Sequence, residues 1–269
     1  MTSDAQQATD SIRQARATTF GAAAGYYDRY RVGAPDEVVD RLLPTGLGAV
    51  LDLGAGTGAM TRRLVGRAER VYAVEPDPRM IEVLREGCPG AEVHQGSAEA
   101  LPLPDSCVDA VVVASAWHWM DPAVAIPEIA RVLRPGGTLC LVWSRRDRSV
   151  PWVADLEAVR NEVTGGDDWV DGRITYYLAE PWLPAGSPLA DIEILGLPWS
   201  APLTKDELVR MLTTYGSFIS APEERKPGML AKLAEHVHGD ERIAAAEDRD
   251  DALVSLPMVC HVWRATLAG

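Results

Sequence analysis

A carboxylate and a set of closely spaced glycines stand together in the first quarter of the chain. Asp52 lies near the end of an apolar run that starts at Ala49, and Gly54, Gly56 and Gly58 follow it. A glycine loop between a strand and a helix lets backbone N–H groups approach a ligand at the helix N-terminus. The spacing also fits the GxGxxG/A fingerprint of dinucleotide-binding loops. This loop therefore predicts a nucleotide-type ligand.

The charge of Asp52 separates two interpretations of this loop. A pyrophosphate beside the carboxylate would place like charges a few ångströms apart in a partly dry cleft, which is costly. S-adenosylmethionine carries a sulfonium and an ammonium group instead, and Asp52 would stabilise both. Glu75, at the end of the next strand candidate, suits the ribose hydroxyls of either ligand. We therefore favour S-adenosylmethionine over a nicotinamide dinucleotide.

The elements that must position these residues alternate between strands and helices. Apolar runs that indicate strands start near residues 49, 70, 91, 108 and 137, and helical patterns separate them. This order predicts right-handed crossovers and a mostly parallel sheet. The nearly continuous β-branched run 108–114 is typical of a central strand covered on both faces. Pro127 predicts a kink or a restart in the helix that follows Asp121, and 135–137 predicts its end.

Beyond residue 145 this alternation changes. Residues 153–163, 205–215 and 222–237 have helical patterns, whereas 192–195 and 258–263 are extended. The arrangement suits one sheet with helical insertions rather than two independent domains. We predict a single domain over 1–269, with a cofactor-binding core at 40–145, lid or substrate elements at 1–35 and about 146–250, a strand at 191–197 that interrupts them, and a last strand at 256–267.

Several segments together resemble the class I S-adenosylmethionine-dependent methyltransferases. Val50–Gly58 is similar to the first motif of that family, and 74–77 to its acidic ribose strand. The order continues with 96–103 as the adenine loop, 108–111 as the fourth strand and 131–137 before the fifth. The resemblance implies an α/β fold: a Rossmann-like, doubly wound, mostly parallel seven-stranded sheet with one antiparallel strand, plus helical lid insertions.

The resemblance implies a role for each residue of the glycine loop. Gly54 and Gly56, with Ala55 between them, would pass under the methionine part of the cofactor. Asp52 would orient the ammonium group of that part. Glu75 would accept hydrogen bonds from the two ribose hydroxyls.

Five further residues would surround the adenine. Pro76 and Met80 would pack on the ring, and Ala98 would offer its backbone N–H to the ring edge. Glu99 would accept a hydrogen bond from the exocyclic amine. Ser97 stands where the family often carries Asp, so the contact expected there passes to Glu99.

The residues after the fourth strand would lie where open α/β sheets bind their ligands. The resemblance implies Ser115 near the methionine and the sulfonium. His118 is the candidate catalytic residue, a general base for an acceptor that must lose a proton; the alternative is a ring packed between two tryptophans. Trp117 is a candidate substrate contact, with core packing as the alternative.

An N-terminal segment, Phe20–Arg31, and the Trp-His-Trp stretch resemble a small-molecule subgroup with ubiquinone/menaquinone-type and trans-aconitate-type enzymes. In that subgroup the segment folds over the cofactor as part of a lid. Tyr26 and Tyr30 are four residues apart and share a helical face, so either would contact the methionine carboxylate or the acceptor. Amphipathic packing on the sheet is the alternative. Arg31 would pair with a carboxylate of cofactor or substrate, or lie at the surface.

Charge and composition restrict the partners. The net charge of −13 disfavours nucleic acid as the main partner. No apolar run is long enough to span a bilayer, and the N-terminus has no apolar signal core. The four cysteines and five histidines show no metal-ligand spacing, so we predict no metal. We expect a cytoplasmic protein, a monomer or homodimer, that acts on a small molecule.

The leading hypothesis is transfer of a methyl group from S-adenosylmethionine to a small-molecule acceptor, with S-adenosylhomocysteine as product. Oxygen is the favoured acceptor atom, and the reaction is an in-line displacement. Two alternatives stay open: an S-adenosylmethionine-binding protein with a non-methylating role, and an NAD(P)-dependent oxidoreductase. Converging arginines in the pocket would favour a carboxylate acceptor, whereas an apolar, aromatic pocket would favour a polyketide, quinone or phenol.

Overall fold

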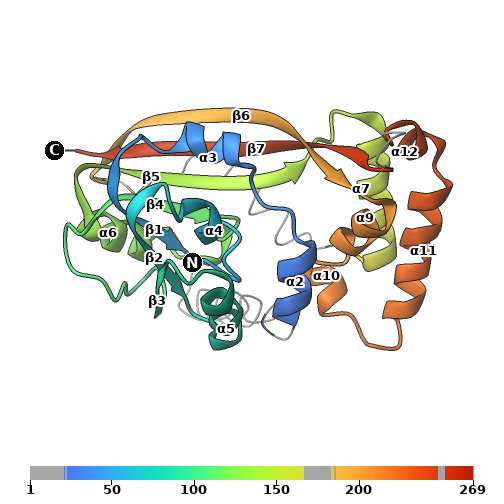
Figure 1. Ribbon diagram of the computed structural model, residues 1–269, viewed down its shortest axis with the longest axis horizontal. Helices are drawn as coiled ribbons and strands as arrows, with labels where there is room; N and C mark the ends of the chain where they lie inside the picture. Colours follow the sequence, from blue (N-terminus) through green and yellow to red (C-terminus); the bar gives the residue numbers. More distant parts are fainter. Residues whose placement is uncertain (1–20, 22, 167–182, 185, 248–251, 269) are drawn as a thin grey trace.

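A seven-stranded mixed sheet organises the fold (Figure 1). The computed structural model describes residues 21, 23–166, 183–184, 186–247 and 252–268. The strands in sheet order are β3 (Glu92–Gln95), β2 (Ala68–Glu75), β1 (Leu47–Leu53), β4 (Val108–Ala114), β5 (Leu133–Arg146), β7 (Val254–Leu267) and β6 (Leu189–Leu203). Only β7 runs antiparallel to its neighbours. The predicted Rossmann-like sheet with one antiparallel strand is confirmed.

Helices cover both faces of the parallel part, which makes the sheet doubly wound. Along β4, Val111 and Val113 pack toward one core cluster, and Ala110 and Val112 toward the other. This burial on both faces confirms the central strand expected from its β-branched run. The helices of this part are α2 (Ala24–Tyr30), α3 (Asp36–Leu42), α4 (Thr61–Leu64), α5 (Pro78–Gly87) and α6 (Pro122–Val132), with a 3-10 turn, η2 (Trp117–Trp119).

The strand order of the sheet reverses between β1 and β4. From β1 it builds β2 and β3 outward on one side, and β4 then pairs with the other side of β1. Asp52 of β1 pairs in register with Ala73 of β2 and with Val112 of β4. Open α/β sheets bind ligands at the carboxyl ends of the strands flanking such a reversal.

Local signals set several element boundaries. The side chain of Asp77 accepts a hydrogen bond from the Arg79 N–H at the start of α5, and Asp121 caps α6 in the same way. Two details around α6 differ from the expectation. The helix continues through Pro127, so of the predicted kink or restart the restart is absent; Pro127 removes only one helical hydrogen bond. β5 begins at Leu133, directly after the helix and before the Pro-Gly-Gly segment.

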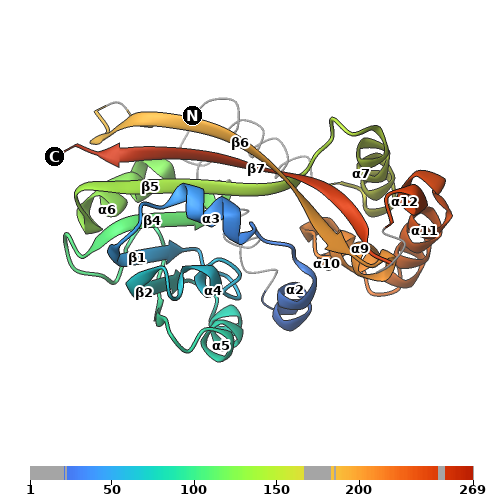
Figure 2. The ribbon, with the colours of Figure 1, turned by 45° about the horizontal axis from the view of Figure 1, so that its top comes forward.

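The last three strands are longer than the sequence indicates. β6 covers 15 residues and β7 covers 14, against predicted strands at 191–197 and 256–267. Pro198 and Pro202 interrupt the apolar pattern of β6, yet β6 is the edge strand, where missing backbone donors are tolerated. Figure 2 shows β6 and β7 running on from the parallel sheet to a separate helical group.

This helical group has its own hydrophobic core. Leu208, Leu212, Leu233 and Val237 are fully buried there and pack with Val254 and neighbouring residues of β7. The group lies within the predicted lid region, of which 167–182 falls outside the described residues, as do 1–20 at the N-terminal lid. Its helices are α7 (Pro151–Thr164), α9 (Lys205–Leu212), α10 (Gly216–Ile219), α11 (Lys226–Gly239) and α12 (Glu241–Ala245).

We expect Leu233→Ala to lower the free energy of unfolding by about 2–5 kcal/mol, because it removes a fully buried side chain of α11 and leaves a cavity. Urea unfolding followed by circular dichroism measures the change. Val124→Ala is the control, since Val124 is 46% exposed on α6 and its truncation should cost less than about 0.5 kcal/mol. Equal losses in the two variants would contradict a separately packed helical core.

Candidate active site

One cavity of about 1140 Å³ reaches from the carboxyl edge of the sheet to the helical group. Its lining comes from the β1 loop, the end of β2, the loop 96–99, the segment after β4, the end of β5, α2, α7 and residues 214–217. This volume slightly exceeds the usual range of small-molecule sites, about 300–1000 Å³. The cavity therefore offers room for more than one ligand group.

Asp52 lies at the inner wall of this cavity and is fully buried. Its Oδ2 accepts a hydrogen bond of 2.6 Å from the Thr61 hydroxyl, whereas its Oδ1 is buried without a hydrogen-bond partner. Burial raises the pKa of Asp52 to about 7, although the bond from Thr61 lowers it. A buried carboxylate oxygen without a donor is costly. The site therefore suits a cationic hydrogen-bond donor, as the ammonium group of an amino acid would provide.

The glycine loop is constrained by its backbone geometry. Gly54 and Gly56 have φ values of +72° and +58°, in the region that favours glycine. A Cβ atom at Gly54 would lie 2.7 Å from the Cβ of Ala116. Both glycines line the cavity, as does the buried Ala55. The loop therefore presents backbone, rather than side chains, to whatever occupies the cavity.

Glu75 closes the end of β2 beside this loop. Its Oε2 accepts a hydrogen bond of 2.9 Å from the Gly56 N–H, and its Oε1 accepts one of 3.0 Å from the Asp77 N–H. Burial raises the pKa of Glu75. Each carboxylate oxygen has a second acceptor position, and Glu75 lines the cavity. The carboxylate can hold the loop and still accept hydrogen bonds from hydroxyl groups.

The residues predicted to contact adenine lie together at one end of the cavity. Pro76, Met80, Ser97, Ala98 and Glu99 all contribute to its lining. Met80 and Ala98 are buried, and Glu99 accepts a hydrogen bond of 2.9 Å from the Asp121 N–H. The structure thus gives Glu99 a role in starting α6 that the sequence analysis did not consider.

The segment after β4 contributes Ser115 and His118 to the cavity, but not Trp117. Ser115 has a φ of +54°, an uncommon conformation for a residue with a side chain. His118 is buried, and its ring centroid lies 4.5 Å from that of Trp119. Trp117 is fully buried in the core between the sheet and α6. Its position matches core packing, the alternative to a substrate contact.

Helix α2 turns a different face to the cavity from the one expected. Tyr27 and Arg31 line it, whereas Tyr26 and Tyr30 do not. The Tyr26 hydroxyl lies 2.6 Å from the Thr213 hydroxyl, and the rings of Tyr26 and Tyr30 are 4.8 Å apart. Tyr27 and Arg31 have the same four-residue spacing as Tyr26 and Tyr30, so spacing alone does not distinguish the two faces.

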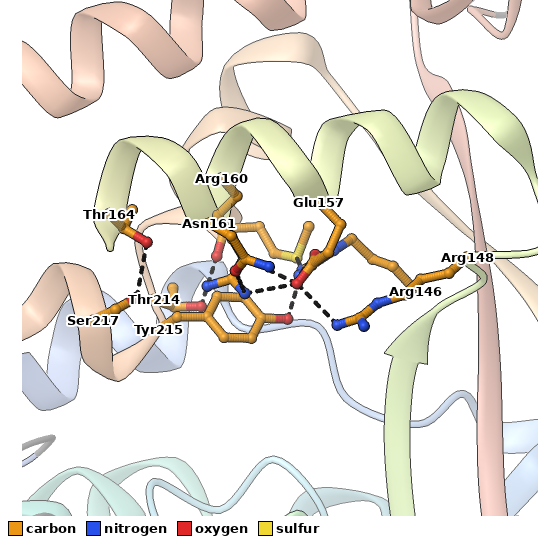
Figure 3. A network of polar contacts seen from close by, with 10 residues as sticks. Arg146, Arg148, Glu157, Arg160, Asn161, Thr164, Thr214, Tyr215 and Ser217 are labelled. Atoms are coloured by element: carbon orange, nitrogen blue, oxygen red, sulfur yellow. Dashed lines mark hydrogen bonds and ion pairs between the residues drawn. The ribbon is translucent and has the colours of Figure 1, made fainter. Parts of the chain in front are cut away.

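The far end of the cavity holds a cluster of charged residues that the sequence analysis did not assemble (Figure 3). Arg160 and Glu157 project from α7 toward Arg146 at the end of β5. Glu157 accepts hydrogen bonds from Arg146 Nε at 2.8 Å and from Arg160 Nη2 at 2.6 Å. Burial raises the pKa of Glu157, but the charges of Arg146 and Arg160 outweigh this and lower it to about 2.

Tyr215 lies at the centre of three guanidinium groups. Those of Arg31, Arg146 and Arg160 lie 4.5, 4.7 and 4.6 Å from its ring centroid. Arg146 Nη1 also donates a hydrogen bond of 2.5 Å to the Tyr215 hydroxyl. Burial raises the pKa of Tyr215, but the charges of Arg146 and Arg31 outweigh it and lower the pKa to about 8. We call Arg31, Arg146, Arg160 and Tyr215 the arginine–tyrosine cluster.

Two further findings concern only the described part of the chain. No helix within it is long and apolar enough to cross a membrane. No three of its histidine, cysteine, aspartate or glutamate side chains gather in a way that could hold a metal ion.

Known proteins share the sequence motifs and the fold. Residues 51–141 match a family model described as a methyltransferase domain. An uncharacterized methyltransferase of Mycobacterium tuberculosis (strain ATCC 25618 / H37Rv) is 40% identical over 257 residues, which cover 95% of this chain and 98% of that protein. The malonyl-[acyl-carrier protein] O-methyltransferase of Serratia marcescens is 35% identical over 140 residues, 49% of this chain and 54% of that protein.

A solved structure extends the likeness to the fold. The YcgJ protein from Bacillus subtilis has a TM-score of 0.51 and 19% identity, over 87% of this chain and 97% of that one. At this identity the likeness concerns the fold alone. The domain match and the relative that aligns over nearly the whole chain show that the protein belongs to the class I S-adenosylmethionine-dependent methyltransferases, with S-adenosylmethionine as its cofactor.

Proposed function

We propose that this methyltransferase transfers the methyl group to an oxygen atom of a small-molecule acceptor bound beside the cofactor. The observation that carries the proposal is the continuity of the cavity, which joins Asp52 and Glu75 at one end to Arg146 and Tyr215 at the other. The cofactor motif occupies the first end only. The second end is therefore available to an acceptor.

The residues of the first end fit the cofactor in charge and shape. The partnerless Oδ1 of Asp52 suits the ammonium group, Glu75 suits the ribose hydroxyls, and the backbone at Gly54 and Gly56 leaves room for the methionine part. S-adenosylmethionine supplies an electrophilic methyl group on a sulfonium. The protein therefore has to align the acceptor with that group and exclude water, which can contribute several kcal/mol.

His118 is the side chain that we assign to the acceptor proton. Of the five histidines, all within the described residues, only His118 lines the cavity. Its imidazole would take the proton of an acceptor hydroxyl as the new bond to oxygen forms. The O-methyltransferase of Serratia marcescens, which resembles half of this chain, supports oxygen as the acceptor atom.

Family membership removes the ground for the oxidoreductase alternative, since the glycine loop was its only support. No contact in the described part of the chain specifically favours the non-methylating alternative. The cytoplasmic location and the monomeric or homodimeric state stay predictions.

Release of S-adenosylhomocysteine tests the function directly. The full chain is incubated with S-adenosylmethionine and a panel of small hydroxyl- and carboxyl-bearing acceptors, and the products are identified by mass spectrometry. We expect methyl ethers or esters in amounts equal to the S-adenosylhomocysteine formed. Products methylated only at nitrogen or carbon would contradict the proposal, and so would no turnover across the panel.

We expect Asp52→Asn to weaken S-adenosylhomocysteine binding by about 10- to 100-fold. The amide keeps the shape of Asp52 but loses the charge, and hydrogen bonds to charged groups contribute about 1.5–3 kcal/mol. Isothermal titration calorimetry measures the affinity. Glu82→Gln is the control, because it also removes one negative charge, but at an exposed position of α5. This variant should bind S-adenosylhomocysteine like the unaltered protein. Equal affinity in both variants would show that the Asp52 charge does not bind the cofactor.

Cofactor binding should also depend on pH through Asp52. Its pKa of about 7 means that the free protein carries a mostly protonated Asp52 in mild acid. Because the ammonium group prefers the ionised carboxylate, binding releases a proton. The association constant should therefore rise up to about tenfold per pH unit from about pH 5 toward pH 7, and level off above. If the association constant of Asp52→Asn depended on pH in the same way as that of the unaltered protein, Asp52 would not be the group that releases the proton.

We expect His118→Gln to lower kcat about 100-fold or more for a hydroxyl acceptor, while S-adenosylhomocysteine affinity stays the same. The loss should shrink for a carboxylate acceptor, which is already ionised. Steady-state kinetics with one acceptor of each kind measures the difference. An equal loss on both acceptors would assign His118 to packing rather than to proton transfer.

A further inference from the structure

The arginine–tyrosine cluster brings three guanidinium groups around one tyrosine ring. Arg31, Arg146 and Arg160 line the far end of the cavity together with one carboxylate, Glu157. Arg146 and Arg160 are 6% and 2% exposed. Guanidinium groups stay ionised in proteins, and burying their charge is costly unless it is paired. Glu157 pairs with Arg146, Arg148 and Arg160, whereas Arg31 brings its charge to the cavity from the end of α2.

The cluster faces the cavity. All four members of the cluster are lining residues, and the lowered pKa of Tyr215 shows that the local field favours negative charge on its oxygen. The hydroxyls of Thr164 and Ser217, 3.0 Å apart, line the same end. Guanidinium groups present planar pairs of donors that match the oxygens of carboxylates and phosphates. A ligand anion would find both charge and hydrogen-bond donors there.

The cluster is distant from the edge of the sheet at which the cofactor residues lie. β4 ends at Ala114, which pairs in register with Val142 of β5. Arg146 stands four residues further along β5, about 13 Å at the usual strand rise of about 3.3 Å per residue. Ser115, by contrast, follows Ala114 directly. An anion bound to the cluster would therefore lie toward the far end of the cavity rather than beside Ser115.

We propose that the arginine–tyrosine cluster binds a carboxylate or phosphate group at the end of the acceptor remote from its methylated oxygen. The proposal rests on the proposed function and specifies its substrate class: an elongated, anionic small molecule. Arg31 has a particular place in it, because it reaches the cluster from the end of α2 and contacts the Tyr27 and Tyr215 rings. Arg146 and Arg160, by contrast, pair with Glu157.

Binding of short amphiphiles tests the site without turnover. Hexanoate, hexyl phosphate and the neutral hexanamide are titrated into the full chain saturated with S-adenosylhomocysteine, with tryptophan fluorescence or calorimetry as readout. We expect at least one of the two anions to bind ten or more times more tightly than hexanamide. The stronger of the two identifies the anion. Equal affinity for all three probes would overturn the proposal.

Arg31→Gln should remove most of this preference, because it deletes one charge of the cluster and leaves the Glu157 pairs in place. Arg242→Gln is the matched control: Arg242 lies on α12, pairs with Asp155 and Asp240, and is not a lining residue. It should keep the anion preference unchanged. If Arg31→Gln keeps the preference, or loses S-adenosylhomocysteine affinity by the same factor as anion affinity, the assignment of Arg31 to the acceptor is overturned.

Two outcomes distinguish the anion site from the proposed function. Anion preference without any methyl transfer would leave the site standing and overturn the function. Equally efficient methylation of acceptors with and without a remote anion would leave the function standing and overturn the site.

Discussion

The proposed cofactor site depends on a single buried carboxylate. Asp52 lies inside the sheet edge with one oxygen held by Thr61 and the other without a donor. A buried acceptor without a donor is costly, and a donor with positive charge would remove that cost. The neighbouring glycines leave that approach open, since their backbone conformations exclude larger side chains. In the proposed site, cofactor choice thus follows from charge and access at one residue.

That the residues proposed for the cofactor line one cavity could be predicted from sequence, because they follow strand ends in order. Asp52, Glu75 and Ser115 each stand at or just beyond the carboxyl end of β1, β2 or β4, and parallel strands bring those ends to one edge. A short stretch of chain therefore specifies each contact. The expected fold is likewise that of the structure, because helical patterns separate most of the apolar runs; between β3 and β4 the chain crosses without a helix.

The acceptor end could not be predicted in the same way. Arg31, Arg146, Arg160 and Tyr215 come from four separate parts of the chain, and no local spacing links them. Arg146 belongs to a short basic run that is equally typical of a solvated loop, and it becomes part of the site only because β5 continues past β4. Similarly, which pair of residues on α2 faces the cavity depends on how the helix packs against α5 and α9.

The unbroken length of β5 and β7 makes the acceptor end sensitive to strand register. Side chains alternate between the two faces along a strand, so one residue inserted between Val142 and Arg146 would move the arginine to the opposite face. The loop at Gly54 would be untouched, because it belongs to β1. Under the proposed function, a change of this kind would exchange the acceptor while keeping the cofactor. Single-residue insertions and deletions in these strands are therefore a route by which related chains could diverge in substrate without losing their shared chemistry.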